Sequence, residues 1–209
     1  MACSSPPRPP RHPARPRAQP ALNDDNVAIK AVLKLGQDNG FAADYTEDVA
    51  QLSSAGRLLP YNAVMFLSTT RDTLDCAANA NFYDHAANQP GTVITTDRRD
   101  ASTQELPPRW AFTDEWYDLV PFPTRVRVLA KVDESTPARG VRGDLGHPGH
   151  GGDHPVSWCQ YYDGGRAWLA TLGHDVKAWT DEPLDGDQHF VRHLLGGVKS
   201  VMGMAPFCR

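Results

Sequence analysis

Two strand-like segments joined by a tight-turn sequence place the strongest constraint on the fold. Residues 156–162 and 166–172 contain Val, Trp, Tyr and Thr, residue types that are enriched in β-strands. Asp163-Gly164-Gly165 lies between them, and an Asp-Gly pair favours the positive φ angles of a short hairpin turn. The pattern therefore predicts an antiparallel hairpin in the C-terminal half of the chain.

The N-terminal half instead alternates helix-like and strand-like segments. Apolar side chains repeat at helical spacing over residues 27–35. Residues 23–25 offer N-cap oxygens, and Asn39-Gly40 offers a left-handed C-cap. Residues 61–68 are nearly continuously apolar, which is typical of a strand buried on both faces of a parallel sheet. Because alternating helices and strands build parallel sheets, this half of the chain predicts one.

The remaining elements follow from the same kinds of pattern. A strand with one polar face is predicted over 125–132, where Val and Ala alternate with basic residues. Residues 134–153 are rich in Gly, Pro, Arg and His and are expected to form a loop. The other predictions are strands over 41–45, 92–96 and 114–119, and helices over 72–87 and 188–202. The resulting fold class is α/β, with a mostly parallel sheet and an antiparallel hairpin at one edge.

Composition limits the number of domains and the classes of partner. The 209 residues suit one domain, with residues 1–22 as a disordered Pro/Arg-rich tail and 23–209 as the folded part. The net charge of -4 gives no reason to expect nucleic acid or a membrane surface, because either would require a clustered basic face. No stretch approaches the roughly 20 apolar residues of a membrane helix. No apolar segment follows the N-terminal arginines, so we expect a cytoplasmic protein without a cleaved secretory signal.

The cysteines are widely separated in the sequence. Cys3, Cys76, Cys159 and Cys208 form no Cys-x-x-Cys pair, so a zinc site closed by thiolates is not expected. We expect reduced thiols in a reducing compartment. Spacing alone leaves a disulfide open, because it does not determine the distance between two cysteines in the fold.

The sequence Asp114-Glu115-Trp116-Tyr117 combines two carboxylates with a phenol. Alternate residues of a strand share a face, so Glu115 and Tyr117 would lie on one side, and Asp114 and Trp116 on the other. A carboxylate beside a phenolic hydroxyl can act as an acid/base group with a hydrogen-bond donor. The competing interpretation is a polar edge strand, since isolated carboxylates usually lie at the solvated surface.

Two histidines border the predicted hairpin. His154 lies just before its first strand, in which Trp158 could stack on a sugar ring. His174 follows its second strand, and ligands of open α/β sheets bind beyond the carboxyl ends of the strands. Each residue also has a structural interpretation. His154 could cap the strand, Trp158 could be a core residue and His174 could be structural.

Several histidines also lie close together in the predicted loop. His147, His150 and His154 occur with Asp153, and imidazole and carboxylate groups bind transition metals. The surrounding glycines favour a loop that does not hold ligands in a fixed geometry. We therefore interpret these side chains as incidental loop residues and expect no metal. The sequence also contains no phosphate-binding loop and no GxSxG elbow.

Ordered motifs along the chain resemble those of the ThuA-like (trehalose utilisation) family. WAFTDEWY at 110–117 and HPVSW at 154–158 are similar to the family's w…DEwY and HPiaW motifs. GGRAWLATLGH at 164–174 is similar to gGRvfytalGH. Further similar segments occupy 36–48, 61–75 and 193–203.

The resemblance implies a three-layer flavodoxin-like or class I glutamine amidotransferase-like fold. It also implies a role in the metabolism of trehalose-type disaccharides or keto-sugars. Glu115 and His174 would form the acid/base pair, and Asp114 would orient or bind. The implied residues that bind a small-molecule sugar are Tyr117, His154 and Trp158. The sequence does not identify a cofactor.

Departures from the family leave other functions open. The opening strand and the Gly-rich elbow with its histidine are both missing, and residues 90–91 lead directly into the next strand-like segment. Losing a central strand exposes unpaired edges, which would allow homo-oligomers to form. The alternative function is a non-catalytic, degenerate ThuA-like domain that binds a sugar or a protein partner. A third interpretation is a metal-assisted enzyme that uses His154, His174 and Asp114.

Overall fold

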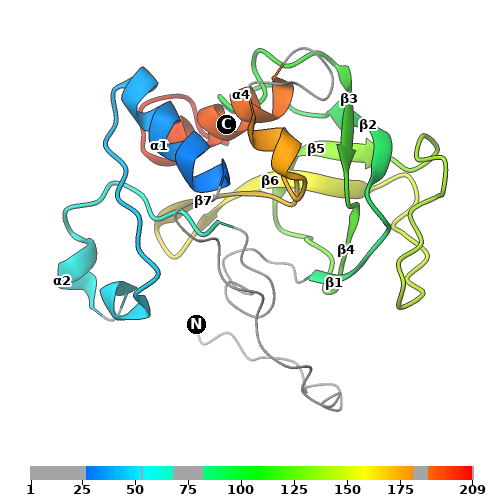
Figure 1. Cartoon of the computed structure of the whole chain (residues 1–209), viewed down its shortest axis with the longest axis horizontal. Helices are drawn as coiled ribbons and strands as arrows, with labels where there is room; N and C mark the ends of the chain where they lie inside the picture. Colours follow the sequence, from blue (N-terminus) through cyan, green and yellow to red (C-terminus); the bar gives the residue numbers. More distant parts are fainter. Residues whose placement is uncertain (1–26, 53, 68–81, 181–187, 209) are drawn as a thin grey trace.

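The computed structural model describes residues 27–52, 54–67, 82–180 and 188–208 (Figure 1). Several sequence predictions lie outside the described residues and stay predictions. They are the tail over 1–22, the N-cap over 23–25 and the greater part of the helix over 72–87.

The described residues form a curled five-stranded sheet and a two-stranded ladder (Figure 1). The larger sheet has the order β3-β2-β5-β6-β7, and the ladder pairs β1 with β4. The strands are β1 Phe82–His85, β2 Gln89–Thr95, β3 Arg109–Asp114, β4 Tyr117–Leu119, β5 Arg127–Asp133, β6 His154–Tyr162 and β7 Gly165–Ala170. The strands predicted over 92–96 and 125–132 are confirmed as β2 and β5.

The predicted hairpin is confirmed as β6 and β7. Asp163 and Gly164 both have positive φ, at 48° and 78°, as a two-residue type I′ turn requires. The strands pair from Ser157 opposite Ala170 up to the turn. The local turn sequence was therefore sufficient to locate this hairpin.

The prediction of a mostly parallel, flavodoxin-like α/β sheet is wrong. Every strand pair among the described residues is antiparallel. Residues 61–67 were expected to be a buried parallel strand, but they form no strand and their side chains are mainly exposed. Residues 41–45 also form no strand, and residues 82–85, expected to be helical, form β1. A short apolar run is compatible with several structures, and the partners available in the fold decide among them.

Two longer helices were predicted correctly. The helices are α1 Val27–Asn39, α2 Ala55–Leu58 and α4 His189–Val201, with 3₁₀ turns η1 Val49–Leu52 and η2 Val176–Trp179. After α1, Gly40 has φ 75° and the Phe41 N–H donates to the Gly36 carbonyl at 3.0 Å, which is a Schellman C-cap. None of the helices in the described ranges is long and apolar enough to cross a membrane.

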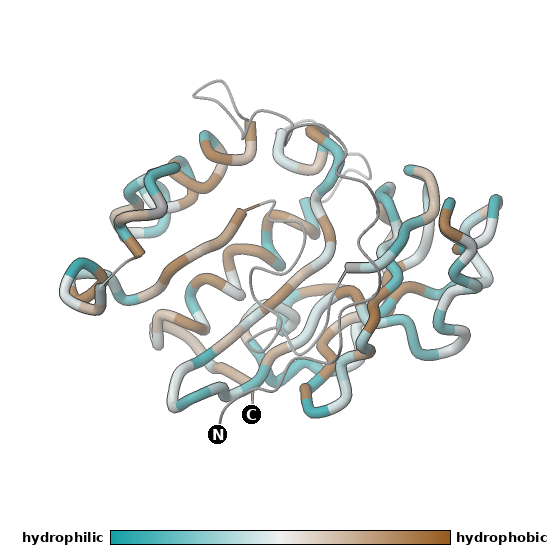
Figure 2. The backbone as a smooth tube through the Cα atoms, turned by 90° about the horizontal axis from the view of Figure 1, so that it is seen from below, coloured by the Kyte–Doolittle hydropathy of each residue, from teal (hydrophilic) through white to brown (hydrophobic). Residues whose placement is uncertain are grey.

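The main core lies between the five-stranded sheet and helices α1 and α4 (Figure 1). Phe190 and Leu194 of α4 share one buried cluster with Val93 and Val156 of the sheet. The ring of Phe112 stacks on Phe190 with centroids 5.6 Å apart. In Figure 2, hydrophobic and hydrophilic residues alternate along the helices, as expected for elements that bury one face. This packing fixes the ends of β3 and β7, where candidate site residues lie.

Cys159 of β6 and Cys208 near the C-terminus form a disulfide, with Cα atoms 5.8 Å apart. The expectation of reduced thiols is therefore wrong for this pair, while Cys3 and Cys76 lie outside the described residues. The bond spans a sequence separation of 49 residues and lies in a small buried cluster with Phe207. No local pattern indicates this bond, because only the fold brings the C-terminal residues back to β6.

Candidate active site

Side chains alternate between buried and accessible at the corner between β3 and β4. Asp114 and Trp116 are both 0% exposed, whereas Glu115 and Tyr117 are only partly buried. This matches the alternation predicted from the sequence, but the single strand predicted over 114–119 is wrong, because β3 ends at Asp114 and β4 begins at Tyr117. Glu115 and Tyr117 therefore face the same accessible side, where they can meet residues from other elements.

Two histidines from distant segments reach Glu115 on that side. His85 ends β1, His174 lies in the loop after β7, and Nδ1 of each is 3.4 Å from Glu115 Oε2. The Tyr117 hydroxyl is 3.1 Å from His174 Nδ1. We call Glu115, Tyr117, His85 and His174 the acid/base cluster. Its two histidine side chains are 33% and 51% exposed, so both can exchange protons with solvent or a ligand.

Asp114 holds the loop that carries His174. Its carboxylate accepts the N–H of Gly173 at 2.6 Å, of His174 at 3.1 Å and of Glu115 at 3.0 Å. Burial raises the pKa of Asp114 to about 7, and the three N–H bonds oppose that rise. Asp114 thus holds the backbone of the loop that carries His174. The role that the resemblance implies for it, to orient or to bind, stays a prediction.

Gly173 allows this loop to lie close to the core. Its φ is 103°, and a Cβ there would lie 2.6 Å from the Phe190 ring and 3.0 Å from Trp179. The Trp179 indole donates to the Gly173 carbonyl at 2.8 Å. Asp114 accepts the N–H of Gly173 and Trp179 donates to its carbonyl, so the backbone of Gly173 is held on both sides. A side chain at this position would clash with Phe190 and Trp179.

The Tyr117 hydroxyl remains protonated in this environment. Burial raises its pKa above the ordinary value of 10, and the negative charges of Glu115 and Asp114 raise it further. The hydroxyl is therefore a neutral donor. It can donate to His174 Nδ1, which would leave the proton of a neutral imidazole on Nε2.

His85 was missed by sequence reasoning. It fell within the helix predicted over 72–87, whereas the structure pairs it with Tyr117 across the β1–β4 ladder. The two rings lie 5.7 Å apart between centroids. The only signal that could have identified His85 is the pairing of β1 with β4, and no local pattern encodes that pairing.

The structure places His154 and Trp158 in the interior. They are 0% and 2% exposed. Trp158 packs against Leu119, so stacking on a sugar would require its neighbours to move. The metal site considered from the sequence would need His154, His174 and Asp114 together. Asp114 instead bonds to the backbone of the His174 loop, and His154 lies in another network. Among the described residues, His154, His174 and Asp114 do not form a metal-ligand group.

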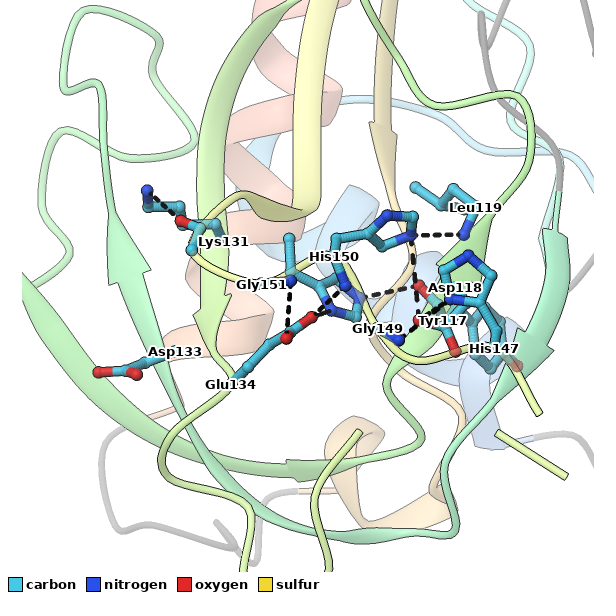
Figure 3. A network of polar contacts seen from close by, with 12 residues as sticks. Tyr117, Asp118, Leu119, Lys131, Asp133, Glu134, His147, Gly149, His150 and Gly151 are labelled. Carbon is cyan, nitrogen blue, oxygen red and sulfur yellow. Dashed lines mark hydrogen bonds and ion pairs between the residues drawn. The ribbon is translucent and has the colours of Figure 1, made fainter. Parts of the chain in front are cut away.

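That other network lies around Asp118 of β4 (Figure 3). Asp118 Oδ1 is 3.2 Å from His147 Nδ1 and 3.9 Å from His150 Nε2. His154 contacts Glu134 with Nδ1 at 2.7 Å. We call Asp118, His147, His150 and His154 the histidine–aspartate cluster. Ligand atoms of Asp118, His150 and His154 all lie within 4.8 Å of one another, so this is where the described residues could hold a metal.

A pocket of about 310 Å³ lies elsewhere on the surface. It is lined by Tyr161, Arg166 and residues 203–207. None of its lining residues belongs to the acid/base cluster or to the histidine–aspartate cluster. The acid/base cluster is therefore an accessible surface site that is separate from this pocket.

Comparisons with known proteins agree with the motifs. A family model described as ThuA, trehalose utilisation, matches residues 78–200, more than half of the chain and all residues of both clusters. A solved ThuA-like protein from Bacteroides uniformis is 20% identical with a TM-score of 0.63, covering 83% of this chain and 82% of its own. Another from Parabacteroides merdae is 15% identical with a TM-score of 0.60, covering 90% and 88%. No significant match was found among curated proteins. The shared fold and the family match together establish that this chain belongs to the ThuA family.

Proposed function

We propose that the chain catalyses proton transfer on a sugar, with Glu115 and His174 as the acid/base pair. The carrying observation is the distance of 3.4 Å between Glu115 Oε2 and His174 Nδ1 at an accessible position. The family description, trehalose utilisation, supports a sugar of the trehalose-type disaccharide or keto-sugar class as substrate.

The chemistry of the cluster suits a carbonyl-bearing sugar. Glu115 would take a proton from a hydroxyl or from the carbon next to a carbonyl, and His174 would return one to oxygen. The Tyr117 hydroxyl, which stays protonated, would donate a hydrogen bond to the developing negative charge. Asp114 would keep the His174 loop in place through its backbone bonds.

Two substitutions test this function. Glu115→Gln and His174→Ala should each lower turnover of the active sugar by about 10²–10⁴-fold, the usual contribution of a positioned acid or base. Activity would be assayed on disaccharides and their keto forms. Lys34→Ala, at an exposed ion pair with Asp38 on α1, is the matched control. Full activity in both cluster variants would rule out the proposal.

Binding without turnover is a second candidate function. It is favoured by the open position of the cluster, since the His174 side chain is 51% exposed and the pocket of about 310 Å³ lies elsewhere. A sugar that raises the thermal midpoint but yields no product would support it, because ligands of the native state stabilise that state. Any turnover that depends on Glu115 would exclude it.

A further inference from the structure

Asp118 is a buried acid without a hydrogen-bond partner. Its side chain is 0% exposed, and neither carboxylate oxygen accepts a hydrogen bond among the described residues. Burying a carboxylate in this way is costly unless a positive charge or donors compensate it. The surroundings of Asp118 therefore indicate what compensates its charge.

The two nearest imidazole nitrogens cannot supply a proton in this arrangement. His147 Nδ1 accepts the Gly149 N–H at 3.1 Å, and His150 Nε2 accepts the Leu119 N–H at 2.9 Å. A ring nitrogen that accepts an N–H carries a lone pair and no hydrogen. Two proton-free nitrogens thus lie within 3.9 Å of the buried Asp118 Oδ1, an arrangement that a bound cation would stabilise.

His154 is oriented in the way that metal-binding histidines commonly are. Its Nδ1 is 2.7 Å from the Glu134 carboxylate, and its Nε2 is 2.9 Å from the Tyr117 carbonyl. Ligating histidines usually donate the other ring N–H to a carboxylate, which fixes the ring and leaves the second nitrogen for the metal. Glu134 would hold His154 in this way. Nε2 would then bind the ion in place of its contact with the Tyr117 carbonyl.

The loop that carries His147 and His150 is anchored by two carboxylates. Glu134 accepts the Gly151 N–H at 2.8 Å, as Figure 3 shows. Asp84 of β1 accepts the N–H groups of Leu145 at 2.9 Å and of His147 at 3.2 Å. The glycine-rich sequence suggested a loop unable to position ligands, but these bonds hold its backbone close to β1 and to the end of β5.

We propose that the histidine–aspartate cluster binds one divalent transition-metal ion of the Zn²⁺ class, with Asp118, His147, His150 and His154 as ligands. One carboxylate and three imidazoles form a closed tetrahedral set suited to zinc. With bonds of about 2.1 Å, tetrahedral ligand atoms lie roughly 3.4 Å apart. The ligand atoms of Asp118, His150 and His154 already lie within 4.8 Å of one another. His147 Nδ1 lies 3.2 Å from Asp118 Oδ1, and its side chain would have to move toward the other two histidines to complete the set. The ion would tie β4 to the loop before β6.

Metal content of the full chain provides the test. The protein is stripped with a chelator, reloaded with Zn²⁺, freed of excess metal and analysed for zinc per chain. We expect about one zinc per chain, and zinc at 100 times Kd should raise the thermal midpoint by roughly 5–10 °C. Substituting Co²⁺ should give visible absorption bands typical of a tetrahedral nitrogen and oxygen site.

Matched histidine variants locate the ion. His150→Ala should lose the zinc and the cobalt bands, whereas His174→Ala, in the acid/base cluster, should keep both. Circular dichroism of the stripped proteins checks that each variant folds. If His150→Ala does not fold, the wild-type stoichiometry and the cobalt spectrum still decide. The proposal is overturned if the reloaded wild type holds no stoichiometric zinc, if folded His150→Ala retains it, or if His174→Ala loses it.

Discussion

The two faces of β4 hold similar side chains in opposite environments. Tyr117 belongs to the acid/base cluster, where the His174 side chain is 51% exposed. Asp118, the next residue, belongs to the histidine–aspartate cluster and is 0% exposed. Both clusters combine imidazole with carboxylate, yet only the first can exchange protons freely with solvent or a substrate.

Solvent access therefore separates two roles that composition cannot distinguish. An accessible imidazole beside a carboxylate is suited to moving protons, because both partners can change charge at little cost. A buried carboxylate beside lone pairs is suited to holding a cation, since water is not available to solvate its charge. Substitutions in the two clusters should therefore change different properties of the protein.

The largest effects are expected when one residue of each cluster is replaced, because one variant should lose sugar turnover and the other should lose zinc. Glu115→Gln should lower sugar turnover by about 10²–10⁴-fold and leave the zinc content unchanged. Asp118→Asn should lose zinc, because the amide carries no negative charge. Parallel measurements of turnover and metal content on both proteins check this. Loss of zinc in Glu115→Gln would show that the clusters are one site.

His193 in the core shows how burial lowers the pKa of a histidine. His193 is fully buried, its Nδ1 lies 2.9 Å from the Ser102 carbonyl, and burial lowers its pKa from 6.5 to about 4. Its stabilising contribution is complete above pH 6.5. It is lost as the pH falls toward 4, by up to about 3 kcal/mol, because the unfolded chain takes up the proton first.

Urea unfolding at several pH values tests this contribution. His193→Gln, which does not titrate, should show a shallower loss of unfolding free energy between pH 6.5 and 4 than the wild type. An equal slope in both proteins would assign the acid sensitivity to other groups.

Asp114→Asn should damage the acid/base cluster without changing its titratable groups. The Asn NH₂ would face the N–H of either Gly173 or His174, which leaves buried donors unpaired. We expect a loss of about 1–3 kcal/mol in stability together with lower turnover, and unchanged zinc content. Chemical denaturation and kinetics measure both effects. Normal stability and normal turnover in Asp114→Asn would contradict the positioning role of Asp114.

The smallest expected effect concerns the residue after His174. Asp175 accepts the Lys177 N–H as the N-cap of η2, and it also accepts a hydrogen bond from Asn88. Asp175→Ala should cost about 0.5–1 kcal/mol and alter turnover only modestly, because Asp114 still holds the loop. An effect as large as that of Asp114→Asn would mean that the cap, rather than the buried carboxylate, sets the position of His174.

Features that depend on a few consecutive residues could be predicted from the sequence, whereas features that depend on distant segments could not. The β6–β7 turn at Asp163 and the C-cap at Gly40 were predictable, because a turn or cap depends on a few consecutive residues. The alternation from Asp114 to Tyr117 was predictable for the same reason. The strand expected over 61–68 was not found over 61–67, because an apolar run becomes a strand only when a partner strand is available.

The sequence was sufficient to locate helices α1 and α4 and the β6–β7 hairpin. Its motifs indicated the ThuA family and made Glu115 and His174 candidates. The antiparallel sheet and the contact between His85 and Glu115 instead depend on tertiary packing. The bond between Cys159 and Cys208 depends on it as well. The physical reason is that periodicity and turn chemistry act between near neighbours in the chain. Ladders, disulfides and clusters of ionisable groups instead depend on which distant segments the packed core brings together.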